Sequence, residues 1–550
     1  MVSAAEKKVV DVGAAINTEK NIQLEREFKE GEISINTAWL LLAYRPTPEV
    51  LTTDLASLAS MFRHPAKVVR EVGYTDLLWL ESFPLVWRIM LNSPYARRIK
   101  YFSKAVVGIM PLVLERSKAS CGVELISNSG LSPIYADVVS SPKHSVVLAA
   151  TGEGKSVFMG EFVTTGLANG QNVTIIDSTR EDGSGTYEAL TNFLGGEYFN
   201  CISSSSNIFE TAYLWKKEID PKLKQAKQNI SQNLLTEGLV LMCTDSDTPK
   251  HEVKTSRGLI NLTLSAFFDD PQIIERYESA VRGGIGSINW TSIPTIHDYL
   301  PFLSPDTFNI ELTSEKISAL YNIRLAIEAV LSGPLGTAIG SPSTIRPDNP
   351  LVVYALGGVD NEADLAVLAL AAYSAALSRS FESASSFLLF DEVSYLLGNY
   401  ECFAKIIGSI WAKARKLGIS AMCAGQDLNS ILKTNAASQV IENTTNFFIG
   451  GIKSPAVAKL SEILDIPEKI LLLNTMDNFR CDQKEFATSW LYKNDSYLTY
   501  AKYYPALEQL AILVNEPNLA ARRAEYFQKY PNKYEAIAEF TKYFTSTVGA

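Results

Sequence analysis

The chain has few of the residues that build disulfide frameworks and transition-metal sites. Its 550 residues include six cysteines and four histidines. The cysteines form no C-x-x-C pair, and the histidines show no ligand-like spacing. These absences disfavour a secreted disulfide scaffold and a zinc or iron protein, so we expect reduced and mostly buried thiols in a cytoplasmic protein.

Long apolar runs and blocks of basic residues are also missing. The longest apolar stretches, near residues 39–44 and 365–377, are shorter than the roughly 20 residues that a membrane-spanning helix needs. The formal net charge is −10, from 50 Lys and Arg against 60 Asp and Glu. This balance disfavours a protein whose main surface holds nucleic acid, although nucleic-acid binding stays open as a secondary alternative.

A glycine-rich segment carries the strongest chemical signal. Residues 144–156, HSVVLAATGEGKS, are typical of a buried strand that runs into a tight turn and then a helix. Gly152 and Gly154 let backbone N–H groups curl around a phosphate chain. Lys155 can place its charge at the β- and γ-phosphates, and Ser156 can ligate Mg²⁺. The pattern predicts a site for ATP or GTP with Mg²⁺, formed by Thr151, Gly152, Glu153, Gly154, Lys155, Ser156 and Val157.

Two residues in this segment depart from the usual pattern. Ala149 occupies the first glycine position, where a small side chain should be tolerated. Glu153 is an acid inside an anion-binding loop. We expect its carboxylate to point to solvent, because it would otherwise repel the phosphates.

The order of predicted elements indicates an α/β fold. At this length we expect two or three domains. Apolar strand-like runs that alternate with helical patterns occur at 172–177, 195–199, 351–356, 386–390, 420–425 and 447–450. This alternation predicts a doubly wound, mainly parallel sheet with its ligand at the carboxyl ends of the strands. Residues 211–331 are mainly helical in pattern and should form an inserted all-α subdomain.

A second acidic element follows the apolar run at 387–390. Asp391 can hold the Mg²⁺ shell opposite Ser156, and Glu392 can orient the water that attacks the γ-phosphorus. Two surface acids capping a strand are the alternative, but a phosphate loop in the same chain favours the hydrolytic interpretation. Asp177, after the 172–177 strand, is interpreted as a sheet-end cap rather than a member of the nucleotide site.

Three further polar residues are candidates for catalysis. Gln426 follows the 420–425 strand, where an amide can position water and sense the γ-phosphate. Arg415 and Lys416 stand at a predicted helix end, where cations also complement the helix dipole. Our sharper hypothesis is that one of them reaches a nucleotide, in the same chain or across a subunit boundary.

Taken in order, these motifs resemble those of the conjugation and type IV secretion ATPases of the TraC, TrbE and DotO type. The resemblance covers about residues 70–540, and the segments that carry it are 149–156, 294–300, 333–336, 356–358, 391–392, 414–418, 424–427 and 441–444. Gly425 is a departure, because threonine is common there in the family. Residues 79–84 look like the closing part of the family's amino-terminal domain, so the chain is expected to be the carboxy-terminal motor portion of a longer protein or a truncated member.

The resemblance implies more than the residues do. It implies a RecA-like phosphate-loop NTPase domain and an ATP hydrolase in the cytoplasm, peripheral at the bacterial inner membrane. It also implies a homo-oligomer, a hexamer, whose partners are inner-membrane channel proteins and further ATPases of the secretion system. The expected divisions are a helical amino-terminal remainder at 1–115, the ATPase domain at 116–210 and 346–550, and the helical insertion at 211–345. Two alternatives stay open, a DNA-translocating motor of the coupling type and a nucleotide-gated structural subunit with little turnover.

Overall fold

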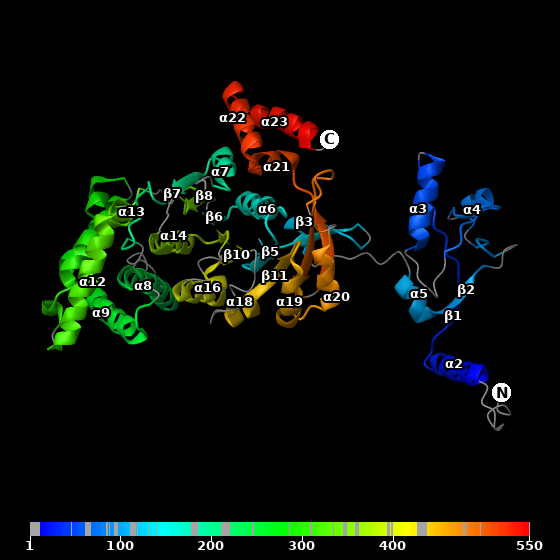
Figure 1. Cartoon of the computed structure of the whole chain (residues 1–550), viewed down its shortest axis with the longest axis horizontal. Coiled ribbons are helices and arrows are strands. Elements are labelled where there is room, and N and C mark those ends of the chain that lie inside the picture. Colours follow the sequence, from blue (N-terminus) through cyan, green and yellow to red (C-terminus); the bar gives the residue numbers. More distant parts are fainter. Residues whose placement is uncertain are drawn as a thin grey trace. The chain divides into compact units, whose positions relative to one another are not determined.

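The chain forms two compact units, Met1–Leu114 and Glu115–Ala550, which are described one at a time (Figure 1). The computed structural model describes residues 12–45, 47–60, 68–83, 86, 88–92, 97–109, 117, 119–129, 131–138, 140–177, 185–210, 220–244, 247–284, 286–308, 311–333, 335–344, 349–357, 362–392, 397, 400–425, 437–476, 479, 481–495 and 497–548. Among these residues, no helix combines the length and the apolar character that a bilayer span requires.

The smaller unit combines helices with a short sheet. Its elements are α2 (Val12–Lys29), β1 (Ser34–Thr37), α3 (Pro48–Ser60), α4 (Thr75–Glu81), β2 (Ile99–Phe102) and α5 (Ser103–Ile109). Strands β1 and β2 pair antiparallel, with Ser34 opposite Phe102. The sequence predicted only helices here, because four-residue strands are too short to show a period of two.

The larger unit is built on one sheet. Its strands are β3 (Val123–Ser127), β4 (Pro133–Ala136), β5 (His144–Leu148), β6 (Asn172–Asp177), β7 (Glu197–Asn200), β8 (Leu351–Ala355), β9 (Ser386–Phe390), β10 (Ile419–Gly425), β11 (Thr444–Ile449), β12 (Thr488–Asn494) and β13 (Tyr497–Tyr503). They lie in the order β4-β3-β13-β12-β11-β5-β10-β9-β6-β8-β7. The run from β11 to β7 is parallel throughout, and β12, β13, β3 and β4 extend it antiparallel.

Helices cover both faces of the sheet. Side chains of a strand point alternately to its two faces, so a strand that is apolar throughout needs packing partners on both. On β5, Val146 and Leu148 join one apolar cluster and Val147 joins the other. The first cluster includes α14 (Glu362–Glu382) and α16 (Glu401–Lys413), and the second includes α6 (Lys155–Ala168). The predicted doubly wound, mainly parallel α/β sheet is confirmed.

A helical insertion separates β7 from β8. Its main helices are α8 (Pro221–Cys243), α9 (Lys250–Asp269), α10 (Pro271–Gly283), α11 (Ile296–Tyr299), α12 (Ser314–Ser332) and α13 (Leu335–Gly340). Figure 1 shows these green helices gathered at one end of the larger unit. Within the 294–300 motif, Thr295 and Asp298 form a capping box, and Arg276 binds both carboxylate oxygens of Asp298 at 2.6 and 2.9 Å. The motif thus caps the start of α11 and connects it to α10 within the insertion.

Three carboxy-terminal helices rest on the sheet face that carries α6. They are α21 (Leu507–Leu513), α22 (Pro517–Lys529) and α23 (Lys533–Val548), and α21 packs on α6 and α7 (Glu188–Leu194) (Figure 1). Gly160 of α6 allows this approach, because a Cβ there would lie 2.6 Å from Leu513 Cδ1. Lys533 donates to the Phe193 carbonyl at 2.6 Å, which ties α23 to the end of α7.

Candidate nucleotide site

The predicted phosphate loop has the backbone that anion binding needs. It leaves β5 after Leu148 and enters α6 at Lys155. Gly152 and Gly154 have φ of 85° and 78°, in the left-handed region that glycine adopts without strain. Gly154 is the N-cap of α6 and provides no side chain to cap the first turn. The N–H groups of that turn, with the positive end of the helix dipole, are therefore suited to phosphate oxygens.

Neighbouring strands support the loop closely. Ala150 donates to the Gly451 carbonyl at 2.8 Å, just after β11. The Ala149 methyl is buried and faces Gly450, where a Cβ would lie 2.9 Å away. An alanine therefore fits at the first glycine position because the residue opposite it is itself glycine. On the other side, a Cβ on Gly154 would lie 2.5 Å from Thr488 Cγ2 of β12.

The Glu153 side chain does not extend into solvent, and that prediction is wrong. The residue is half-buried, and its Oε2 is enclosed. A Cβ on Gly451 would lie 2.9 Å from Glu153 Cδ, so the missing side chain of Gly451 makes room for the carboxylate. The acid is accommodated against the backbone that follows β11.

The two predicted acids lie at the same edge as the loop. Asp391 directly follows β9, and its N–H donates to the Ile176 carbonyl of β6 at 3.0 Å. Glu392 Oε2 lies 3.5 Å from Lys155 Nζ. Glu392 also has φ of 53°, a left-handed conformation that is strained for a residue with a side chain. The fold thus brings Lys155 and Glu392 together although 237 positions separate them.

Asp391 sits in an environment that opposes its charge. Burial, and then the neighbouring Glu392, raise the pKa of Asp391 to about 6, while Lys155 acts in the opposite direction. A buried carboxyl of this kind favours its charged form once a cation is close.

Asp177 is a cap, as predicted, but it also borders the site. Its Oδ2 accepts from the Thr186 and Tyr187 N–H groups at 2.8 and 3.4 Å, which orders the entry to α7. Burial, and then the charge of Asp391, raise the pKa of Asp177 to about 7. Asp177 and Asp391 therefore lie near each other at the ends of the adjacent strands β6 and β9.

Tyr187 borders the candidate site, and sequence reasoning missed it. Its side chain is fully buried, and its hydroxyl faces the Asp391 carboxyl and the Ser156 hydroxyl. Among the described residues no hydrogen bond of ordinary distance and angle forms at that hydroxyl. A tyrosine just before a helix carries no pattern that marks it, so only the packing identifies it.

Gln426 lies outside the described residues. The strand that precedes it, β10, lies between β5 and β9, and Gly425 is paired with Leu148. The Ala149 N–H donates to the Gly425 carbonyl at 3.4 Å. The described part of β10 therefore ends beside the start of the phosphate loop.

Arg415 and Lys416 are not brought to the loop within one chain. Both are exposed in a short 3₁₀ helix, Ala414–Leu417, that precedes the amino end of β10. Arg415 acts electrostatically on His144, the first residue of β5, whereas the loop follows the last. Since the two strands are parallel, these cations lie at the opposite edge of the sheet. The same-chain hypothesis for Arg415 and Lys416 is wrong, and contact across a subunit boundary stays a prediction.

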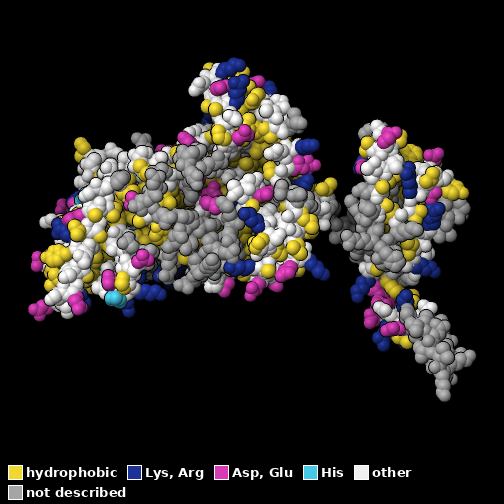
Figure 2. Space-filling view, in the orientation of Figure 1, with side chains coloured by type: hydrophobic (Ala, Val, Ile, Leu, Met, Phe, Trp, Pro, Cys, Tyr) yellow, Lys and Arg dark blue, Asp and Glu magenta, His cyan; other side chains and the backbone are white. Residues whose placement is uncertain are grey.

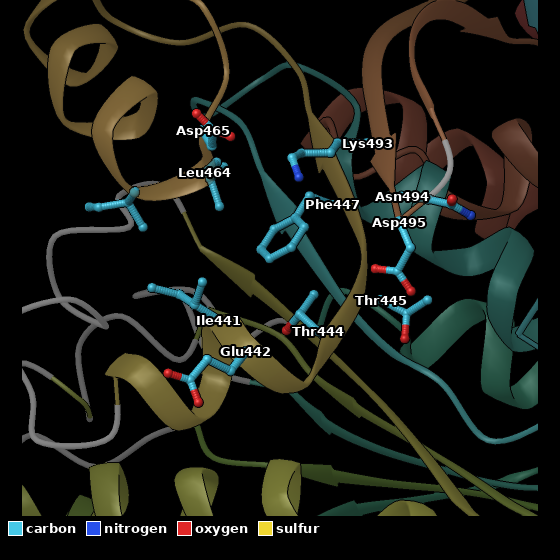
Figure 3. A pocket seen from close by; sticks show the side chains of 11 residues that line it. Ile441, Glu442, Thr444, Thr445, Phe447, Leu464, Asp465, Lys493, Asn494 and Asp495 are labelled. Carbon is cyan, nitrogen blue, oxygen red and sulfur yellow. The ribbon is translucent and has the colours of Figure 1, made fainter.

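A cavity of about 270 Å³ also lies at that opposite edge (Figure 3). It is lined by Ile441, Glu442, Thr444, Thr445, Phe447, Ile463, Leu464, Asp465, Lys493, Asn494 and Asp495. Phe447 of β11 and Lys493 of β12 are directly paired, and Figure 3 shows both beside the same space. The cavity is at the amino end of β11, so it is separate from the phosphate loop.

Comparison with known proteins identifies the fold. No protein-family model matches the chain, and no curated protein sequence matches it. The solved structure of VirB4 of Thermoanaerobacter pseudethanolicus superposes with a TM-score of 0.53 and 15% identity, over 71% of this chain and 98% of that chain. The plasmid coupling protein TrwB, solved with the non-hydrolysable ATP analogue ADPNP, gives 0.44 and 17%, over 70% of this chain and 89% of that chain. The chain therefore has the RecA-like phosphate-loop NTPase fold of the VirB4 structure, and the resemblance predicted from the sequence is confirmed at the level of the fold.

Proposed function

We propose that the chain is an ATPase that energises a type IV secretion machine, for conjugation or effector export. One observation carries the proposal. A phosphate loop with Lys155 and Ser156 meets the acids Asp391 and Glu392 at one edge of a sheet with the VirB4 fold. The groups that would bind the phosphates and the acid that would activate water therefore lie at the carboxyl ends of the strands, where open α/β sheets bind their ligands.

The residues present fit a Mg²⁺-nucleotide. The left-handed glycines and the uncapped start of α6 suit the phosphates. The buried Asp391 carboxyl and the Ser156 hydroxyl both face the Tyr187 hydroxyl, so they lie in the same part of the site. Ser156 and Asp391 would hold Mg²⁺, which would supply charge neutralisation at the phosphates. An oxygen donor set of hydroxyl and carboxylate is what this ion prefers.

Glu392 is the proposed base that orients water. In the described structure it pairs with Lys155, the residue proposed to bind the β- and γ-phosphates. The phosphates would compete for Lys155, which would leave the Glu392 carboxylate available to a water molecule. Gln426 is proposed to position that water and to sense the γ-phosphate, since β10 leads to the same edge.

The cellular setting is proposed on the same basis. We expect a homo-oligomer, a hexamer, that works at the cytoplasmic face of the bacterial inner membrane. Its expected partners are channel proteins and further ATPases of the secretion system. Figure 2 shows acidic and basic side chains interspersed over the described surface of one face, which supports a protein-contacting motor more than a DNA-translocating one.

Turnover of Mg²⁺-ATP, measured together with oligomeric mass, tests the proposal. Glu392→Gln should leave ATP binding intact and slow hydrolysis by at least about 100-fold, because an amide cannot accept the proton of the attacking water. Glu442→Gln is the matched control, since Glu442 is exposed and lines the cavity at the opposite edge.

Two results would count against the proposal. Equal turnover of wild type and Glu392→Gln would remove Glu392 from its role. Absence of turnover in every assembled form, with ATP binding retained, would favour the nucleotide-gated structural subunit.

A further inference from the structure

The segment that carries Tyr187 is held in place from two sides. Asp177 at the end of β6 accepts the N–H groups of Thr186 and Tyr187. The Thr191 hydroxyl donates to the Tyr187 carbonyl at 2.8 Å within the first turn of α7. The Tyr187 ring is fully buried and belongs to the same apolar cluster as Phe158 of α6. Backbone anchoring and ring packing together leave this side chain little freedom.

The Tyr187 hydroxyl is directed at the proposed cation site. It faces Ser156 at the start of α6 and Asp391 after β9, so three separate elements meet at one atom. No hydrogen bond of ordinary geometry satisfies it among the described residues. A buried hydroxyl whose hydrogen bonds are poorly formed costs free energy, so a phenylalanine would pack at least as well. Packing alone does not account for a tyrosine at this position.

We propose that Tyr187 is a positioning residue of the Mg²⁺-nucleotide site. Its phenol sets the separation and orientation of the Ser156 hydroxyl and the Asp391 carboxylate, and Asp177 fixes Tyr187 through the backbone. The inference rests on the proposed function, because it concerns the groups that would hold the cation. It adds a role for strand β6 and α7, which contribute no residue to the predicted site.

The physical argument concerns geometry rather than charge. Mg²⁺ requires near-ideal octahedral ligands, so a small shift of either oxygen weakens its binding. Ligand groups are held in place when their own partners are fixed by packing and hydrogen bonds. Ser156 and Asp391 come from different elements, and a single hydroxyl that faces both of them, held by a packed ring, limits their independent movement.

Tyr187→Phe tests the proposal because it deletes the hydroxyl and keeps the ring. The affinity for a fluorescent ATP analogue is measured with Mg²⁺ and with EDTA, alongside a thermal melt. We expect the gain in affinity that Mg²⁺ confers to fall by at least about fivefold in the variant, with the affinity in EDTA changed by less than about twofold. A variant that folds and keeps the full Mg²⁺ gain overturns the proposal.

Tyr277→Phe is the matched control. It also removes a buried phenol hydroxyl, one that donates to the Phe209 carbonyl at 2.8 Å in the helical insertion. It should lower the melting temperature and leave the Mg²⁺ gain unchanged. An equal loss in both variants would mean that lost stability is the cause, and the positioning role would be wrong.

Asp177→Ala examines the anchor. It keeps the Tyr187 hydroxyl but removes the acceptor of two N–H groups, so a loss of the Mg²⁺ gain intermediate between wild type and Tyr187→Phe is expected. An unchanged gain in a folded Asp177→Ala protein would overturn the anchoring step. Wild-type protein distinguishes failure of the proposed function from failure of the Tyr187 proposal. If wild type binds no nucleotide, the proposed function fails. If wild type and Tyr187→Phe both show the normal Mg²⁺ dependence, only the positioning role of Tyr187 is rejected.

Discussion

Lys155 and Glu392 form an ion pair across the candidate site, with Nζ and Oε2 3.5 Å apart. The Lys155 side chain is 10% exposed and the Glu392 side chain 32%. Lys155 belongs to the phosphate loop, and Glu392 follows the strand that carries Asp391. The pair therefore joins the proposed phosphate-binding group to the proposed base, so a change at either residue should alter the other.

Lys155→Ala should remove nucleotide binding. The ammonium is the positive charge that the loop would place near the phosphates, and its loss leaves Glu392 and Asp391 to repel them. We expect the affinity for a fluorescent ATP analogue to fall at least about tenfold. Lys542→Ala is the control, because it breaks an exposed pair with Glu539 far along the chain. Retained affinity in Lys155→Ala would place the site elsewhere.

Gly152→Ala and Gly154→Ala should differ in severity. Both introduce a side chain at positive φ, which costs about 1–2 kcal/mol. A Cβ at Gly152 meets nothing within 4 Å, whereas one at Gly154 lies 2.5 Å from Thr488 Cγ2. Gly154→Ala should therefore lower stability and nucleotide affinity more than Gly152→Ala does.

Thr488→Ser separates the two causes. It removes the clashing methyl but keeps the hydroxyl that accepts from Trp490 Nε1 at 2.8 Å. In the Gly154→Ala background it should restore the thermal stability to that of Gly152→Ala and no further. Equal melting temperatures of the two single alanine variants would contradict the steric part of the prediction.

Arg415 can be tested only in the assembled protein. Its exposed position at the amino edge leaves contact across a subunit boundary as the way to a nucleotide. Arg415→Ala should then reduce turnover in the oligomer, and mixing it with Lys155→Ala protein should restore part of the activity, since each variant supplies the group that the other lacks. Mixtures no more active than the sum of the separate variants would reject the role.

Glu210→Gln should change how stability depends on pH. Burial raises the pKa of Glu210 to about 7 from 4.5, while Ser343 donates to its carboxylate. Between these values the folded state holds a proton that the unfolded state has lost, so the free energy of unfolding falls as pH rises. Glutamine does not titrate, so the stability of the variant relative to wild type should rise from pH 4.5 to pH 7, by at most about 3 kcal/mol.

Denaturant titrations of both proteins at pH 5 and pH 8 measure this difference. Glu275→Gln serves as control, because Glu275 is exposed on α10. If the stability of the variant relative to wild type is the same at pH 5 and pH 8, burial does not raise the pKa of Glu210 and the prediction is wrong.

Local patterns in the sequence determined the phosphate loop, the acids Asp391 and Glu392, and the alternation of strands and helices. These features depend on residues adjacent in the chain: the glycines set the turn, and side-chain periods of 2 and 3.6 distinguish strand from helix. The predicted strand at 172–177 matches β6 residue for residue. The order of strands was not accessible in this way, because pairing joins segments far apart in the chain.

Tertiary structure alone decided which side chains meet. It placed β10 between β5 and β9, and it moved Arg415 to the edge away from the loop. It also put Glu153 against Gly451 and brought Tyr187 to Ser156 and Asp391. Sequence fixes the chemistry a residue can perform, but the direction and register of parallel strands fix which end of the sheet it reaches, and that depends on non-local packing.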